Sequence, residues 1–249
     1  LVVMTLPHGQ VIIALAPQFS PKQVERFKAL VRAKFYDGMA FNRVIDGFVA
    51  QAGPEGVSAD FPLLTAPIAL EPDWPISSSW DFTLVQAPDM FAPQTGFKDG
   101  YAIGVDSVAE RAWLLHCPGV IGLGRNNEPD TASSHFYITI GQAPRYLDRI
   151  MSLFGRVVLG MEHVQAIQRT ENQLGKLTQD TMFTHIHKMR MMSDLPEEEQ
   201  QHIAIENTAH EAFVKKVNQR KHRQHPFFFK SPPPVIDACQ VPLKTKLKL

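Results

Sequence analysis

Apolar residues at the start of the chain fall into two short runs separated by turn residues. Residues 1–16 read LVVMTLPHGQVIIALA, and the PHGQ tetrapeptide interrupts the apolar pattern after the sixth residue. Two runs of this length around a turn predict a β-hairpin. The break also leaves too short an apolar segment for a membrane-spanning helix, which needs about 20 residues.

A helical spacing of apolar residues follows this hairpin. Ser20 and Gln23 have the spacing of a capping box, Pro21 suits the first helical turn, and Gly38 ends the pattern. The predicted helix has one apolar face, formed by Val24, Phe27, Val31 and Phe35.

The pattern loosens between residues 54 and 116. Pro, Asp, Ser and Gly are frequent there, and aromatic residues occur without a period. This composition predicts a long, partly ordered connection with one short strand near residues 81–87 (DFTLVQA). We interpret its aromatic residues as a local core in preference to a ligand site.

Strand patterns return in the second half of the chain. Residues 120–123, 136–140 and 153–160 are predicted strands, and residues 161–168 a short helix. Helices therefore occur only near the two ends of a series of strands. This order favours a closed or nearly closed antiparallel barrel over an α/β fold, in which strands and helices would alternate.

Composition narrows the function only slightly. The chain has 249 residues, of which 44% are hydrophobic, enough for one large domain or a domain with an appendage. Lys plus Arg and Asp plus Glu are balanced at 25 each, so the overall charge favours neither nucleic acid nor an anionic membrane as a partner. The two cysteines, Cys117 and Cys239, allow one internal disulfide or two free thiols.

Three motifs carry a family resemblance. They are FYDGMAFNRVIDGFVAQAG (residues 35–53), LLHCPGVIGLGRNNEPDTASSHFYITIG (114–141) and YLDRIMSLFGRVVLGMEHV (146–164). In this order they resemble the cyclophilin family of peptidyl-prolyl cis-trans isomerases over about residues 1–168. The resemblance implies a mainly β fold: a closed eight-stranded antiparallel barrel capped by two helices, with the active site on its outer face and no cofactor or metal.

The resemblance also assigns a domain organisation. It implies an isomerase domain over residues 1–168 with a long insertion at about 54–116. Residues 169–249 lie outside the resemblance, and their own patterns predict an α+β C-terminal extension that packs on the barrel.

Site residues are carried over by position in these motifs. Arg43 takes the place of the catalytic arginine, and Gln51 orients it or the substrate backbone. His135 departs from the family pattern, which commonly has glutamine there. The residues that take substrate-binding positions are Phe48, Val49, Gly124, Phe136, Tyr137, Tyr146 and Leu147, with Tyr137 as the floor of the proline pocket.

Two functions follow as alternatives. The first is isomerisation of Xaa-Pro bonds in client polypeptides, and the second is a proline-binding or chaperone module with little turnover. No nucleic acid or membrane span is expected, and the sequence does not decide the oligomeric state. Similarity to long bacterial cyclophilins implies the periplasm or cell envelope, after removal of an export signal, with the cytoplasm as the alternative.

The extension contains three further candidates. His185 and His187 alternate on a predicted strand, but two histidines without a third ligand are poor support for zinc. Residues 215–225 (KKVNQRKHRQH) form a basic, helix-like run that we interpret as a solvated face. With one cysteine in each part of the chain, a bridge between Cys117 and Cys239 is a hypothesis, and two buried free thiols are the alternative.

Overall fold

Two compact units make up the chain in the computed structural model, which describes residues 1–54, 66–142, 144–177 and 183–248. The first unit contains Leu1–Pro72 and His116–Gln201, and the second contains Asp73–Leu115 and His202–Leu249. This division differs from the predicted boundary at residue 168. The first part of the expected extension joins the first unit because two of its strands pair with strands near the N-terminus.

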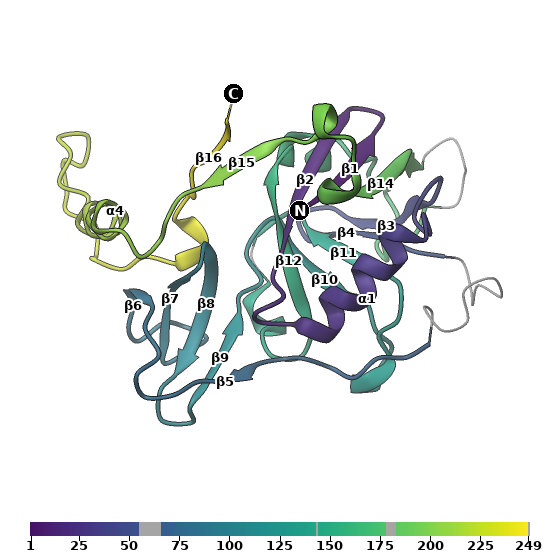
Figure 1. Cartoon of the computed structure of the whole chain (residues 1–249). Helices are drawn as coiled ribbons and strands as arrows, with labels where there is room; N and C mark the ends of the chain where they lie inside the picture. The colour runs from purple at the N-terminus through teal and green to yellow at the C-terminus, as the bar shows by residue number, and fades with distance from the viewer. Residues whose placement is uncertain (55–65, 143, 178–182, 249) are drawn as a thin grey trace. The chain divides into compact units, whose positions relative to one another are not determined.

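Nine strands form one antiparallel sheet among the described residues of the first unit, in the order β13-β3-β4-β11-β10-β12-β2-β1-β14 (Figure 1). Their bounds are β1 Val2–Leu6, β2 Gly9–Leu15, β3 Ala40–Ile45, β4 Val49–Ala52, β10 Val120–Leu123, β11 Phe136–Thr139, β12 Leu153–Leu159, β13 Thr184–His185 and β14 Lys188–Met191. The predicted N-terminal hairpin is confirmed as β1 and β2, and the three predicted strands of the second half as β10, β11 and β12.

The two edge strands of this sheet, β13 and β14, follow one another in the chain and are separated by Ile186 and His187. They pair with β3 and β1, and within the described residues they form no ladder with each other. The nine-stranded sheet confirms a mainly β fold with few helices. Because no ladder joins the edge strands in the part of the chain that the structure describes, the closed eight-stranded barrel stays a prediction.

Apolar side chains from the sheet and from helix α1 (Pro21–Arg32) form the core of the first unit. Phe136 is fully buried there, and its ring lies 5.6 Å from that of Phe27 and 5.1 Å from that of Tyr36. The second helix, α3 (Met161–Gln165), contributes the buried Val164. The short helical turns of this unit are η1 Pro129–Thr131, η2 Arg145–Leu147, η4 Met192–Asp194 and η5 Glu197–Glu199.

The start of α1 is stabilised differently from the prediction. Ser20 donates its hydroxyl to the Leu153 carbonyl at 2.5 Å, and Gln23 donates its side-chain amide to the Ala69 carbonyl. The predicted capping box was therefore wrong. The carboxylate of Glu71 accepts the backbone N–H groups of Lys22 and Gln23 instead, so a residue distant in sequence satisfies the helix N-terminus.

The second unit contains a five-stranded antiparallel sheet in the order β5-β9-β8-β7-β6, a two-stranded pair β15-β16, and helix α4. Their bounds are β5 Trp74–Pro75, β6 Thr83–Gln86, β7 Gln94–Lys98, β8 Tyr101–Asp106, β9 Arg111–Leu114, β15 His202–Ile205, α4 Glu211–His222, η6 Ala238–Gln240 and β16 Thr245–Lys248. The predicted strand near residues 81–87 is confirmed as β6. The rest of that sheet was missed, because the region was interpreted as a loose connection.

Glycines inside two of these strands partly explain why the sequence did not predict this sheet. Gly96 in β7 and Gly104 in β8 weaken a strand pattern, yet each lies directly under an aromatic ring. A Cβ on Gly104 would lie 2.3 Å from the Trp113 ring, and one on Gly96 would lie 2.6 Å from the Phe82 ring. The predicted aromatic core is confirmed only for part of the set: Phe97 and Tyr101 are buried, whereas Trp80 and Phe82 are half-buried and stack on each other at 5.9 Å, and Phe91 is exposed.

No helix in the described part of the chain combines the length and the apolar character needed to cross a bilayer.

Candidate active site

A row of directly paired residues crosses three neighbouring strands of the first unit. Arg43 on β3 is opposite Gln51 on β4, and Gln51 is opposite Tyr137 on β11. Paired residues in an antiparallel ladder project to the same face of the sheet. The residues next to them, Ala50 and Phe136, belong to the core, so this row lies on the face that points away from it.

A β-bulge decides which way Arg43 points. In regular alternation Phe41 and Arg43 would share a face, but the register between β3 and β4 shifts between these two residues. Phe41 is consequently fully buried in the core, while Arg43 is half-buried on the opposite face. The bulge therefore places a charged residue outside the core without interrupting the strand that follows it.

The guanidinium of Arg43 is held by two hydrogen bonds. Its Nε donates to the Leu174 carbonyl at 3.1 Å, and its Nη1 donates to Oε1 of Gln51 at 3.3 Å. A guanidinium has five N–H donors, so this pairing fixes its plane and leaves further donors for another group.

A pocket of about 500 Å³ lies beside this guanidinium. Besides Arg43 and Gln51, its described lining residues are Asn42, Pro54, His135, Lys176 and Leu177. The last two come from the expected extension. The backbone of that segment is bonded to β3, with Val44 N–H to the Gly175 carbonyl at 2.8 Å and Leu177 N–H to the Asn42 carbonyl at 3.1 Å. The segment therefore forms one wall of the pocket.

His135 and Gly124 form the opposite side of this region. Burial lowers the pKa of His135 below its usual value, which favours a neutral imidazole in the pocket at pH 7. A Cβ on Gly124 would lie 3.7 Å from the amide nitrogen of Gln51, so this glycine lies close to Gln51, and its part in substrate binding stays a prediction.

Phe136 corrects one of the predicted site positions. It is fully buried among core aromatic rings, and Tyr137, its neighbour on β11, points to the opposite face. The prediction that Phe136 contacts substrate was therefore wrong, because strand alternation allows only one residue of the pair to face the groove.

The other predicted residues lie around the row in different settings. Val49 shares the face of Gln51 and is 4% exposed, and Phe48 is half-buried in the turn between β3 and β4. Tyr146 is 66% exposed, whereas Leu147 is half-buried in the same helical turn. None of these four is among the described lining residues of the pocket beside Arg43.

Tyr137 is held from behind by a buried polar chain, which we call the Asp148 network: Tyr137, His116, Asp148 and Arg145. The Tyr137 hydroxyl lies 3.0 Å from Nε2 of His116, and Nδ1 of His116 lies 2.9 Å from Oδ1 of Asp148. Arg145 donates its Nε to the other Asp148 oxygen at 2.6 Å. Because a carboxylate only accepts, Nδ1 of His116 carries the proton shared with Asp148.

Burial is the main property of this network. The side chains of His116, Asp148 and Arg145 are at most 5% exposed, and Tyr137 is 4% exposed. Burial, followed by the nearby negative charge of Asp148, raises the pKa of Tyr137, so its hydroxyl stays protonated. The Tyr137 ring is thereby fixed over Gly122, where a Cβ would lie 2.4 Å from the hydroxyl oxygen.

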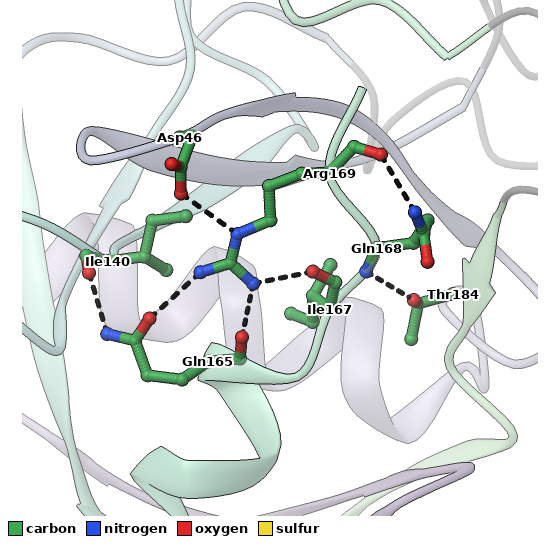
Figure 2. Close-up of polar contacts among 7 residues, drawn as sticks. All are labelled: Asp46, Ile140, Gln165, Ile167, Gln168, Arg169 and Thr184. Carbon is green, nitrogen blue, oxygen red and sulfur yellow. Dashed lines mark hydrogen bonds and ion pairs between the residues drawn. The ribbon is translucent and has the colours of Figure 1, made fainter. Parts of the chain in front are cut away.

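The turn of the β3–β4 hairpin is fixed by Arg169 (Figure 2). Its Nε donates to Asp46 at 3.2 Å, its Nη1 donates to the backbone carbonyls of Gln165 and Ile167 at the end of α3, and its Nη2 donates to Oε1 of Gln165. Gln165 in turn donates to the Ile140 carbonyl, just beyond β11. A cation that satisfies the last carbonyls of a helix thus anchors the hairpin that carries Arg43.

The arrangement is suited to binding a polar backbone next to an apolar surface. It presents fixed N–H donors and an amide, and the described residues contain no cluster of three or more His, Cys, Asp or Glu side chains placed to hold a metal ion. Electrostatic binding of a substrate carbonyl is the chemistry that such donors support.

Comparison with known proteins decides the family. The model of the family described as "Cyclophilin type peptidyl-prolyl cis-trans isomerase/CLD" matches residues 1–191, well over half of the chain. The chain belongs to the cyclophilin-type peptidyl-prolyl cis-trans isomerases. It is therefore an isomerase of this type, in agreement with the resemblance carried by its three motifs.

Related proteins with curated names agree with this assignment. A "Probable peptidyl-prolyl cis-trans isomerase" of Brucella suis biovar 1 (strain 1330) is 29% identical over 168 residues, which cover 68% of this chain and 71% of that protein. The mouse "Peptidyl-prolyl cis-trans isomerase-like 3" is 28% identical over 163 residues, covering 65% of this chain and 77% of that protein.

The fold has a solved counterpart along nearly the whole chain. The crystal structure of cyclophilin AquaCyp293 from Hirschia baltica has a TM-score of 0.79 and 24% identity, and the alignment covers 99% of this chain and 90% of that one. A Cryptosporidium parvum cyclophilin, crystallised in the presence of the dipeptide Ala-Pro, has a TM-score of 0.52 and 17% identity over 76% of this chain and 97% of that one.

Sequence reasoning missed two groups of residues around the site of this cyclophilin. The first is the pocket wall at residues 174–177, which carries no chemical signature of its own. The second is the Asp148 network, for which a signal existed: Arg145 and Asp148 stand three residues apart, the spacing of an ion pair on a helical turn. His116 could not be connected to them from sequence.

Proposed function

We propose that this cyclophilin accelerates rotation about Xaa-Pro bonds in client polypeptides, with Arg43 as the electrostatic catalyst. The amide C–N bond has partial double-bond character and a rotation barrier of about 18–20 kcal/mol, and the reaction neither breaks a covalent bond nor removes a proton. A catalyst has only to bind the twisted amide more tightly than the planar forms.

Arginine suits this task because twisting redistributes charge in the amide. The nitrogen regains its lone pair and the carbonyl loses its resonance partner, so a fixed guanidinium can hold the carbonyl oxygen and donate toward the nitrogen. The hydrogen bonds of Arg43 to Gln51 and to the Leu174 carbonyl support this role, since they orient the guanidinium before substrate arrives. A lysine would supply charge without a fixed fork of donors.

The apolar part of the site is proposed to hold the proline ring. Tyr137 provides the floor, fixed by its hydrogen bond to His116, and Val49 lies on the same face of the sheet. Phe48 and Leu147 are proposed as side walls because both are half-buried beside this face. The row of Arg43, Gln51 and Tyr137 on one face is the single observation that carries the whole proposal, since it joins the polar and apolar requirements.

Exchange NMR on a short Xaa-Pro peptide tests the function. We expect wild type to accelerate cis-trans exchange and Gln51→Ala to lower kcat/KM by about tenfold, because the guanidinium loses one of its two restraints. Gln18→Ala, at an exposed position of the same unit, is the matched control and should leave the rate unchanged. Well-folded wild type that gives no acceleration would favour the proline-binding module instead.

An oxidising compartment such as the periplasm or cell envelope is the proposed location. Neither Cys117 nor Cys239 is a free thiol, since both are disulfide-bonded. Stable disulfides are typical of secreted and periplasmic proteins and rare in the cytosol. Thiol titration of protein isolated from its native host, denatured without reductant in the presence of a thiol trap, should find no free thiol. Recovery of two thiols would contradict this location.

A further inference from the structure

Positive charge is concentrated in one segment of a chain that is neutral as a whole. Residues 202–249 contain nine Lys and Arg but only three Asp and Glu, and residues 215–230 contain six Lys and Arg and no acidic residue. Lys216 is paired with Glu206 at 2.5 Å. The other five, which form no ion pair within the described residues, are Lys215, Arg220, Lys221, Arg223 and Lys230.

Exposed aromatic rings gather in the same segment, in the loop after α4. We call residues 223–230 the phenylalanine loop. Phe227 is 79% exposed and Phe229 is 91% exposed, while Phe228 is 38% exposed. Contiguous large apolar side chains on a protein surface mark a site of interaction, whereas scattered ones do not.

The loop holds these rings outward through its own backbone. Phe228 N–H donates to the His225 carbonyl at 2.9 Å, and Phe227 N–H donates to Nδ1 of the same histidine at 3.1 Å. The rings of Phe227 and Phe228 meet edge to face at 5.4 Å. A tight turn ends α4, with Arg223 in a left-handed conformation, and three prolines follow the loop. The rings are therefore displayed by local structure.

We propose that the phenylalanine loop and the basic end of α4 bind the surface of an anionic lipid bilayer. Phe227 and Phe229 would insert at the boundary between headgroups and acyl chains, and the unpaired cations would contact the anionic headgroups. Apolar side chains beside Lys and Arg are the features by which peripheral proteins bind such surfaces. This charge complementarity is local, because the rest of the chain is net acidic.

Single-stranded nucleic acid is the alternative partner for a surface with both cations and aromatic side chains. It is bound in a positively charged groove whose separate aromatic side chains stack successive bases. The phenylalanine loop instead has three consecutive rings, two of them in edge-to-face contact and two projecting almost fully into solvent. Projecting rings are better suited to insertion into an apolar layer than to stacking, so the bilayer is the partner favoured by this geometry.

Vesicle flotation of the full chain tests the proposal. Binding to mixed phosphatidylcholine–phosphatidylglycerol vesicles should be at least about tenfold tighter than to pure phosphatidylcholine, and should weaken at high salt. Phe227→Ser with Phe229→Ser should weaken it by about tenfold or more. Arg220→Gln with Lys221→Gln should weaken it by about 25-fold, at roughly fivefold per cation near the surface.

Matched controls test whether binding depends on this particular surface or on any exposed apolar or positively charged side chains. Met90→Ser with Val108→Ser removes two apolar side chains that are 87% and 98% exposed elsewhere in the same unit, and should leave binding unchanged. Lys246→Gln with Lys248→Gln removes two exposed cations of β16 and should have less effect than the α4 pair. Peptide isomerisation by all these variants should equal wild type, because the proposed catalytic residues belong to the first unit. Circular dichroism and a cooperative unfolding transition equal to those of wild type check that the second unit folds.

A direct readout of insertion completes the test. Phe229→Trp should show a blue shift of its added fluorescence with phosphatidylglycerol vesicles and none with phosphatidylcholine vesicles. No preference for anionic vesicles, or equal loss in the control pairs, would overturn the proposal. Tighter, Phe227- and Phe229-dependent binding to single-stranded oligothymidine than to vesicles would overturn it in favour of nucleic acid.

Discussion

Arg43→Ala is expected to lower kcat/KM for a Xaa-Pro peptide by about 100- to 1,000-fold, the usual effect of removing one preorganised donor from a stabilised transition state. Arg43 lies on the face of β3 that points away from the core, so the substitution leaves no cavity in the core. The expected loss is therefore in catalysis, while the unfolding midpoint stays close to that of wild type. Exchange NMR gives the rate, and urea unfolding gives the stability.

One further variant separates charge from geometry at this position, and a substitution of a distant surface arginine is its control. Arg43→Lys keeps the positive charge but loses the planar fork, and we expect it to recover only a small part of the rate. Arg32→Ala removes an arginine of α1 that forms an exposed ion pair with Asp194, and should leave kcat/KM unchanged. Activity of Arg43→Ala within about twofold of wild type would show that the guanidinium adds little transition-state binding.

Asp148→Ala is expected to reduce the free energy of unfolding by about 3–5 kcal/mol. Asp148 is 5% exposed and accepts hydrogen bonds from the backbone and ring of His116 and from Arg145. Its removal takes an acceptor 2.6 Å away from the buried Arg145 guanidinium and leaves the buried His116 ring without its carboxylate, and weakening a buried charged network costs far more than losing a surface contact. Because Tyr137 is bonded to the same histidine, activity should fall as well.

A surface ion pair provides the comparison for this loss. Asp194→Ala breaks the ion pair between Asp194 and Arg32, whose side chains are 41% and 52% exposed, and should change the free energy of unfolding far less, because solvent screens exposed ion pairs. If Asp148→Ala proves too unstable to purify, Tyr137→Phe removes only the terminal hydroxyl and should cost about 1–3 kcal/mol. If Asp148→Ala lowers the free energy of unfolding no more than Asp194→Ala does, a structural role of the Asp148 network is contradicted.

Local sequence patterns predicted the elements whose contacts are mostly local. The hairpin of β1 and β2 and helix α1 follow from apolar periodicity and turn residues. The small sheet of the second unit was largely missed, in part because two of its strands, β7 and β8, contain glycines that the neighbouring aromatic rings require. Propensity is a weak guide wherever side-chain packing from another segment decides the backbone.

At the candidate site, too, the sequence predicted some features, and others depend on contacts between distant segments. Motif resemblance identified Arg43, Gln51 and Tyr137, and the structure brings them together in one row. It named Tyr137 as the pocket floor but also counted Phe136 among the substrate-binding positions, because only the pairing of β11 in the folded sheet shows that Phe136 enters the core. It also placed residue 168 at the end of the isomerase domain, although Lys176 and Leu177 line the pocket.

The sequence by itself determined the family, the order of the main elements and the identity of the guanidinium that faces the pocket. The tertiary structure alone decided the direction of Arg43, through a bulge in the pairing of β3 with β4, and the support of Tyr137 by His116, Asp148 and Arg145. The reason is physical: residue type and spacing encode local conformation, whereas register and burial depend on partners distant in the chain.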